Sequence, residues 1–77
     1  MNYLDQVIRI VAETMNADPA KLSRDTDIQA DLHADSLDMV EMSMAVEDTF
    51  EIQIDDEAMV QIRTIGDIVD QLEKILQ

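Results

Sequence analysis

Several residue types are scarce or absent in this 77-residue chain, and each absence excludes a kind of chemistry. Cysteine is missing, so the chain has no disulfide, no thiolate metal site and no thiol nucleophile of its own. It has one glycine and one proline, and its strand signals are weak. A chain this short forms one small domain, residues 1–77, that buries only about 60 to 65 % of its unfolded surface. A self-contained enzyme is therefore not expected.

Basic residues are also scarce, because 5 Lys and Arg stand against 18 Asp and Glu, which gives a net charge of −13. The stretch from Asp25 to Ile62 contains no Lys or Arg at all. The electrostatic field of such an acidic chain repels nucleic acid and anionic membranes and attracts basic proteins. We expect basic protein partners and no nucleic acid.

Long apolar runs are absent too. No stretch approaches the 18 to 20 apolar residues of a membrane span, and Met1 to Asp5 show no basic lead or signal-type apolar run. We expect a monomer without a membrane span, located in the cytoplasm.

Apolar residues recur at helical spacing in most of the chain. They predict a first helix from Leu4 to about Asn16, a second over residues 36–50, a short third over residues 55–62 and a last one from Thr64. From Ala20 to Ala34 the helical spacing of apolar residues is lost, which predicts a long loop. Leu22, Ile28 and Leu32 are expected to anchor this loop by packing against the domain. The expected fold is all-α: a four-helix bundle of three longer helices and one short helix, with a long loop between the first and second helices.

Ser36 lies at the start of the second helix. Asp35 is its expected N-cap, and Asp38 follows three residues later in a capping-box-like arrangement. A lone serine among acids, without a base or a metal site, is poorly equipped for catalysis and well placed to be modified. His33 is the only histidine, and because no orienting partner or oxyanion hole is evident we assign it to the loop and not to a catalytic pair.

The second helix has two apolar faces. One arc holds the residues expected in the core: Met39, Met42, Val46 and Phe50. Leu37, Val40 and Met44 form a separate arc, bordered by acidic residues. Either the long loop covers this second arc, or the arc is an exposed strip of the kind that docks proteins. We favour the exposed strip, in which Met44 would adapt to several partners.

The residues of the second helix resemble a known family. The run Asp35-Ser36-Leu37-Asp38, followed by Val40-Glu41 and by residues 45–50, is similar to the acyl carrier protein family, whose usual text is D-L-G-x-D-S-L-D followed by V-E and an acidic helix ending in F. The similarity continues through Ile52-Gln53-Ile54 and through residues 64–67, and so covers nearly the whole chain. It is closest to the free-standing carriers of dissociated, or type II, fatty acid synthesis.

The resemblance implies that a phosphopantetheinyl transferase moves 4'-phosphopantetheine from coenzyme A onto Ser36, and that the thiol of this arm carries acyl groups as thioesters. It implies basic-surfaced partners, namely the transferase, ketoacyl synthases, acyltransferases and other acyl-processing enzymes. The implied partner-binding residues are Asp35, Leu37, Asp38, Val40, Glu41, Met44, Glu47, Asp48, Ile54 and Asp56. The family also shelters the acyl chain inside the bundle, for which the candidates are Met39, Met42, Val46, Phe50, Ile54, Met59, Ile62 and Ile68.

The chain departs from the family pattern at two positions. His33 stands where the family usually has glycine, and if the backbone is left-handed there, histidine carries a strain that glycine would not. Asp55 replaces the usual proline after I-x-I, which leaves the start of the third helix less rigid and adds a charge.

Three alternatives remain open. The attachment motif is shared with carriers dedicated to polyketides or other specialised acyl pathways, so it does not identify the cargo. An acidic interaction protein that mimics nucleic acid would explain the charge but not Ser36 or the apolar strip. A calcium loop starting at Asp25 is disfavoured, because its sixth position is Ala30 where glycine is required and its twelfth is Ser36 where glutamate is required.

Overall fold

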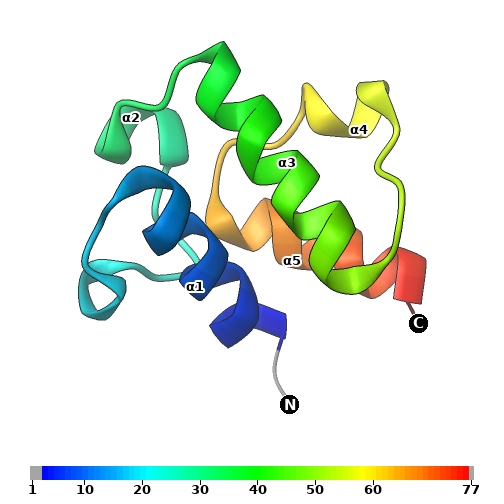
Figure 1. Cartoon of the computed structure of the whole chain (residues 1–77), viewed down its shortest axis with the longest axis horizontal. Coiled ribbons are helices and arrows are strands. Elements are labelled where there is room, and N and C mark those ends of the chain that lie inside the picture. The colour runs from blue at the N-terminus through cyan, green and yellow to red at the C-terminus, as the bar shows by residue number, and fades with distance from the viewer. Residues whose placement is uncertain (1–2, 77) are drawn as a thin grey trace.

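The computed structural model describes residues 3–76, so residues 1, 2 and 77 of the predicted domain lie outside the described residues. The elements follow in the order α1 (Tyr3–Met15), the 3₁₀ turn η1 (Pro19–Lys21), α2 (Ile28–Leu32), α3 (Ser36–Phe50), α4 (Asp56–Met59) and α5 (Ile65–Leu76) (Figure 1). Three long helices and short helical pieces make up the bundle, and the predicted all-α class is confirmed. None of the helices within residues 3–76 is long and apolar enough to cross a membrane.

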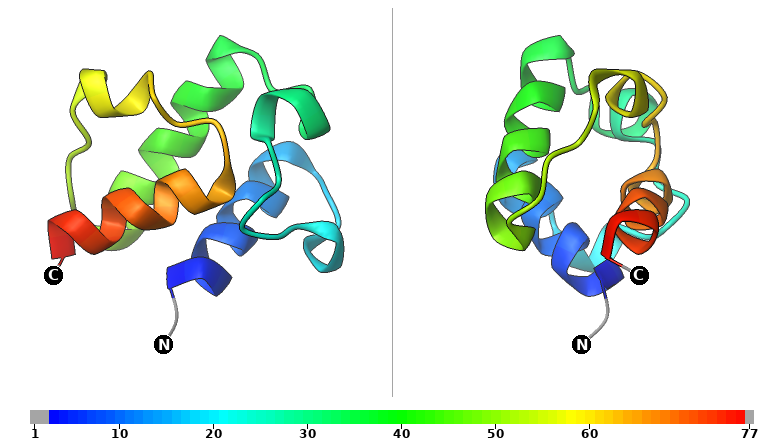
Figure 2. Two further views of the ribbon diagram at one scale, coloured as in Figure 1. Left: turned by 180° about the vertical axis from the view of Figure 1, so that it is seen from behind. Right: turned by 90° about the vertical axis from the view of Figure 1, so that its right-hand side faces the viewer.

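The core lies where the three long helices meet. Helix α1 packs against both α3 and α5, and the views show the long helices surrounding one interior (Figures 1 and 2). At one end, the ring of Tyr3 meets the ring of Phe50 edge to face, with centroids 5.8 Å apart. The side chains that the long helices bury most completely are Val7, Val11, Met42, Val46, Ile65 and Leu72. Burial of one such side chain stabilises the fold by about 1.5 to 3 kcal/mol.

The connection between α1 and α3 contains more structure than predicted. Leu22 and Ile28 are buried and Leu32 is partly buried, as expected of residues that pin the loop. The loop itself, however, forms η1 and the five-residue helix α2. The carboxylate of Asp27 caps α2 by accepting a bond of 2.8 Å from the amide of Ala30. A helix of little more than one turn cannot display helical periodicity, which is why the pattern predicted a loop.

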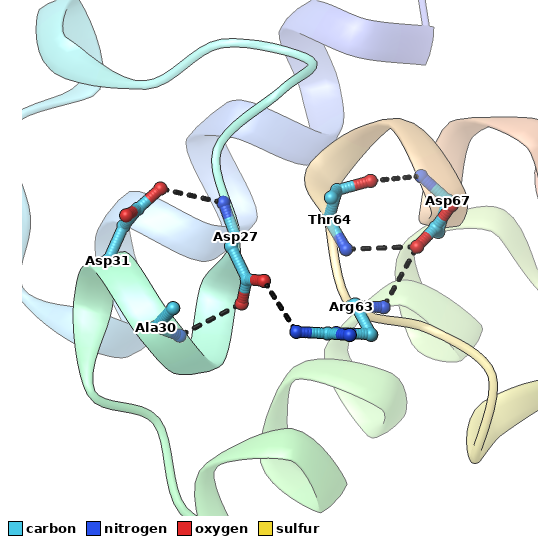
Figure 3. A network of polar contacts seen from close by, with 6 residues as sticks. All are labelled: Asp27, Ala30, Asp31, Arg63, Thr64 and Asp67. Atoms are coloured by element: carbon cyan, nitrogen blue, oxygen red, sulfur yellow. Dashed lines mark hydrogen bonds and ion pairs between the residues drawn. The ribbon is translucent and has the colours of Figure 1, made fainter.

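The same connection is bonded to the start of α5 by a short antiparallel contact. The amide of Ile28 donates to the carbonyl of Arg63 (2.8 Å), and the amide of Ile65 donates to the carbonyl of Thr26 (3.1 Å). The amide of Gly66 donates to the carbonyl of Arg24 (2.8 Å). In the close-up of this region, the guanidinium of Arg63 also reaches the carboxylate of Asp27, at 3.2 Å (Figure 3). We refer to residues 24–28 and 63–66 as the clamp.

Asp67 closes the start of α5 in a reciprocal cap. Its amide donates to the hydroxyl of Thr64 (3.1 Å), while its carboxylate accepts from the amides of Arg63 (2.9 Å) and Thr64 (3.0 Å) (Figure 3). These bonds hold the pKa of Asp67 below its ordinary value of 3.8. The bond from the amide of Arg63 has the larger effect, followed by the bond from the amide of Thr64. The predicted start of the last helix near Thr64 is therefore confirmed, with the cap that stabilises it.

Helix α4 is shorter than the predicted 55–62 segment. It occupies Asp56–Met59, and Asp55 precedes it in extended backbone without a side-chain capping bond. Ile62, which was expected in the helix, instead lies beyond it as a buried residue.

Within residues 3–76, left-handed backbone occurs at three residues that are not glycine: Asn16, His33 and Glu51, with φ of 53°, 59° and 55°. His33 ends α2, and its amide bonds to the carbonyl of Ile28. The predicted strain at this position is present, because the β-carbon of an L-residue crowds the following carbonyl in this region. Histidine tolerates the region better than most residues do.

Replacing His33 by glycine should raise the free energy of unfolding by about 0.5 to 1 kcal/mol, because glycine relieves the left-handed strain by more than it adds to the freedom of the unfolded chain. Urea titration measures the change. His33→Ala is the matched control, since it removes the imidazole and keeps the strain. Equal effects of the two substitutions would show that the backbone angle does not matter here.

Replacing Asp67 by asparagine, a neutral analogue of its protonated form, should lower the free energy of unfolding near neutral pH. Because the pKa of Asp67 is lower in the folded chain than in the unfolded chain, its carboxylate stabilises the fold above pH 3.8. This stabilisation is lost as the pH falls through the pKa of Asp67 in the folded chain. The difference between wild type and variant, followed by thermal melts at stepped pH, should shrink as the pH drops below 3.8.

Asp5→Asn is the control for charge, because it removes one carboxylate from an exposed position on α1. A gap between wild type and Asp67→Asn that stays constant down to strong acid would contradict the assigned role of the Asp67 carboxylate.

Candidate functional site

Ser36 is the first residue of α3, and its side chain is exposed. The predicted capping box forms around it: the amide of Asp38 donates to the carboxylate of Asp35 (2.9 Å), and the amide of Asp35 donates to the carboxylate of Asp38 (3.2 Å). Both flanking carboxylates are thus bonded to the backbone of the first turn. This arrangement holds the backbone at Ser36 in place and leaves its hydroxyl at the surface.

The surroundings of Ser36 are formed by three segments. Helices α2 and α4 lie at the same end of the molecule as the first turns of α3 in every view (Figures 1 and 2). The left-handed turn at His33 lies between α2 and α3. Since the clamp bonds residues 24–28 to the start of α5, the segment that leads to Ser36 is anchored at the start of α2.

The outer face of α3 carries the exposed strip that the sequence predicted. Leu37 is 64 % exposed, Val40 is 44 % exposed and Met44 is 61 % exposed, whereas Met42 and Val46 on the inner face are 1 % exposed. The alternative in which the long connection covers the second arc is therefore wrong. Three large apolar side chains on consecutive turns of one helix form a surface suited to another protein.

The carboxylates expected around this strip divide into two groups. Glu41 and Asp48 are exposed on α3, and Asp56 is exposed at the start of α4. Glu47 is half-buried, and its carboxylate accepts a bond of 2.8 Å from the amide of Ile54. The side chain of Ile54 is 7 % exposed and lies in the core, so it does not extend the exposed strip, although the sequence interpretation grouped it with the partner-binding residues. Glu47 thus ties the segment after α3 to the helix.

A surface groove of about 260 Å³ opens beside Ser36. Its other lining residues come from α2, α3 and the segment around α4: Gln29, Met39, Val40, Met59, Val60 and Ile62. Val60 is 81 % exposed, more than any other large apolar residue among those described. No local pattern predicted this role of Val60, because α4, which it follows, is too short to reveal which side of the segment faces water. The groove offers a largely apolar surface beside Ser36.

A small cavity lies behind the groove, inside the bundle. Of the eight residues expected to shelter an acyl chain, seven line it: Met39, Met42, Val46, Ile54, Met59, Ile62 and Ile68. Phe50 does not, since its ring packs on Tyr3, and Ser43 lines the cavity without having been expected there. The free volume is only about 10 Å³, close to the smallest space that holds one water molecule. An occupant would have to push the lining side chains apart.

The groove and the cavity share three lining residues, Met39, Met59 and Ile62. These side chains form the wall between the surface beside Ser36 and the interior. Two of them are methionines, whose unbranched side chains change rotamer at little cost. A larger hollow of about 520 Å³ lies along the outer side of α1, but it shares no lining residue with the groove or the cavity.

Comparison with known proteins agrees with this geometry. Residues 5–72 match the family model described as "Phosphopantetheine attachment site". A curated relative, "Acyl carrier protein" of Phaeodactylum tricornutum (strain CCAP 1055/1), is 43 % identical over 65 residues, which cover 84 % of this chain and 86 % of the relative. The matched region contains Ser36, the capping box, the exposed strip and the whole lining of the cavity. The chain therefore belongs to the acyl carrier protein family, whose cofactor is phosphopantetheine.

Proposed function

We propose that this chain carries acyl intermediates of dissociated, type II fatty acid synthesis on a 4'-phosphopantetheine arm attached to Ser36. The observation that carries the proposal is the position of Ser36: its exposed hydroxyl lies at a capped helix start, between the exposed strip of Leu37, Val40 and Met44 and the apolar groove. The chain would act as the substrate of a phosphopantetheinyl transferase and not as an enzyme.

The residues present fit this cofactor. Ser36 supplies the oxygen for a phosphodiester. It is the first residue of α3, where the backbone amides have no intrahelical hydrogen-bond acceptor. A phosphate at such a position is stabilised by about 0.3 to 1 kcal/mol. When bound, the arm supplies the thiol that the chain lacks and with it the thioester linkage to the cargo. The groove lined by Met39, Val40 and Val60 gives the arm an apolar surface beside its attachment point.

The charge pattern supports the choice of partners. Asp35 and Asp38 are engaged in the capping box. Glu41 and Asp48 are exposed on α3 and Asp56 is exposed at the start of α4, and no Lys or Arg occurs from residue 25 to residue 62. Basic surfaces of a transferase, a ketoacyl synthase or an acyltransferase would be steered to this face. Because the apolar centre consists of only three side chains, each complex would be weak and exchangeable, as a carrier that visits several enzymes requires.

Incubation of the apo chain with coenzyme A, Mg²⁺ and a broad-specificity phosphopantetheinyl transferase should add one phosphopantetheinyl group, measured as intact mass. The addition should disappear in Ser36→Ala. Ser23→Ala is the matched control, because Ser23 is also exposed but lies outside α3, and it should load like the wild type. A folded wild-type sample that gains no mass would refute the proposal.

Replacing Met44 by aspartate should weaken binding to a basic ketoacyl synthase by about tenfold or more, because it puts a charge at the desolvated centre of the strip. Since Met44 is 61 % exposed, the free energy of unfolding should change by less than about 0.5 kcal/mol. Calorimetric titration measures the first quantity and urea unfolding the second.

Leu76→Asp is the control for an exposed apolar residue elsewhere, since Leu76 is 41 % exposed on α5. It should bind the synthase like the wild type. Equal losses of affinity in the two variants would show that the strip on α3 is not the docking face.

A further inference from the structure

The cavity lining contains one hydroxyl among apolar groups. Ser43 is 6 % exposed, and the seven other lining residues are methionines, isoleucines and a valine. Within the described residues, Ser43 and Thr26 are the polar side chains classed as buried, and Ser43 is the one of the two that lines the cavity. A saturated chain offers this hydroxyl no hydrogen bond, whereas a chain with a polar group can form one with it.

Ser43 lies beyond the wall of Met39, Met59 and Ile62. It follows Met39 by four residues on α3, so the two occupy the same side of the helix about 6 Å apart along its axis. It follows Ser36 by seven residues, which is two turns, or about 10 Å. A chain that entered from the groove beside Ser36 and passed Met39 would therefore meet the Ser43 hydroxyl after one further turn of α3.

The position of Ser43 inside α3 also bears on which polar group of a ligand its hydroxyl can bind. A serine inside a helix can donate its proton to the carbonyl four residues earlier, here that of Met39. Its oxygen lone pairs then remain available as acceptors. A ligand that donates a hydrogen bond, such as a hydroxyl, satisfies them, whereas a keto oxygen or a methylene does not.

We propose that Ser43 makes the interior selective for acyl chains that carry a hydroxyl group over saturated chains of the same length. This inference rests on the proposed function, because it needs an acyl chain attached through Ser36. It assigns to the cavity a polar contact, and to the carrier a preferred class of cargo, namely hydroxyacyl chains. The apolar residues shelter the hydrocarbon, and Ser43 accepts a hydrogen bond from the hydroxyl.

The test compares thioester protection in carriers loaded with a saturated acyl chain or with a 3-hydroxyacyl chain of equal length. A sheltered chain is cleaved from the arm by hydroxylamine more slowly than an exposed one, and each rate is normalised to that of the same acyl group on free pantetheine. In the wild type, the 3-hydroxyacyl chain should be protected about fivefold more than the saturated chain, as expected for one net hydrogen bond.

Three variants make the result specific. Ser43→Ala removes the hydroxyl without adding volume and should abolish the preference, Ser43→Val should favour the saturated chain, and Ser43→Thr should retain the preference. The same protection ratio in the wild type and in Ser43→Ala would overturn the inference. Failure of the arm to attach to Ser36, seen first by intact mass, would instead overturn the proposed function.

Discussion

The backbone contact between residues 24–28 and 63–66 is the constraint on which the rest of the site depends. It joins the middle of the connection to the start of α5 through three amide-to-carbonyl bonds. The two segments approach so closely that a β-carbon on Gly66 would lie 2.7 Å from Cγ and 3.0 Å from the carbonyl oxygen of Arg24. Two exposed ion pairs, Arg24 with Asp70 and Arg63 with Asp27, border the clamp, but such pairs contribute little compared with the buried backbone bonds. With the clamp in place, α2, the turn at His33 and the first turn of α3 form one supported path to Ser36.

The acidic residues of the chain serve two separate purposes. Asp27, Asp35, Asp38 and Asp67 cap helices, and Glu47 holds the segment after α3 through the amide of Ile54. These carboxylates stabilise a fold whose net charge of −13 opposes compactness. Glu41, Asp48 and Asp56 are exposed and remain available to basic partners. The same composition thus stabilises helix starts in one set of positions and, in another, leaves exposed the carboxylates that we propose attract basic partners.

Local patterns in the sequence predicted much of this structure. Helix α3 begins at Ser36 and ends at Phe50 as predicted, because a capping box and a sustained apolar period mark it in the sequence. The exposure of Leu37, Val40 and Met44 followed from a second arc that a bundle helix does not need for its core.

The contacts that the sequence did not predict are long-range, or belong to elements too short to show a period. The clamp joins residues 35 to 42 positions apart, and α2 spans only five residues, too few to show a period. The capping residue Asp27 was nevertheless a usable signal for the start of α2. The left-handed turn at Glu51, the burial of Ser43 and the exposure of Val60 depend on how α3 and α4 pack, which no local pattern encodes.

We propose above that Ser36 is an acceptor whose chemistry is supplied by other molecules. The chain contributes a capped helix start, an exposed apolar strip and a surface groove. The groove and the interior cavity share part of their lining. The most direct measurement is fragmentation mass spectrometry of the protein isolated from the cells that make it, which assigns any modification among Ser23, Ser36 and Ser43. The assignment of Ser36 as the acceptor predicts a phosphopantetheine arm on Ser36 alone. An arm on Ser23 or Ser43, or a chain that never carries one, would contradict it.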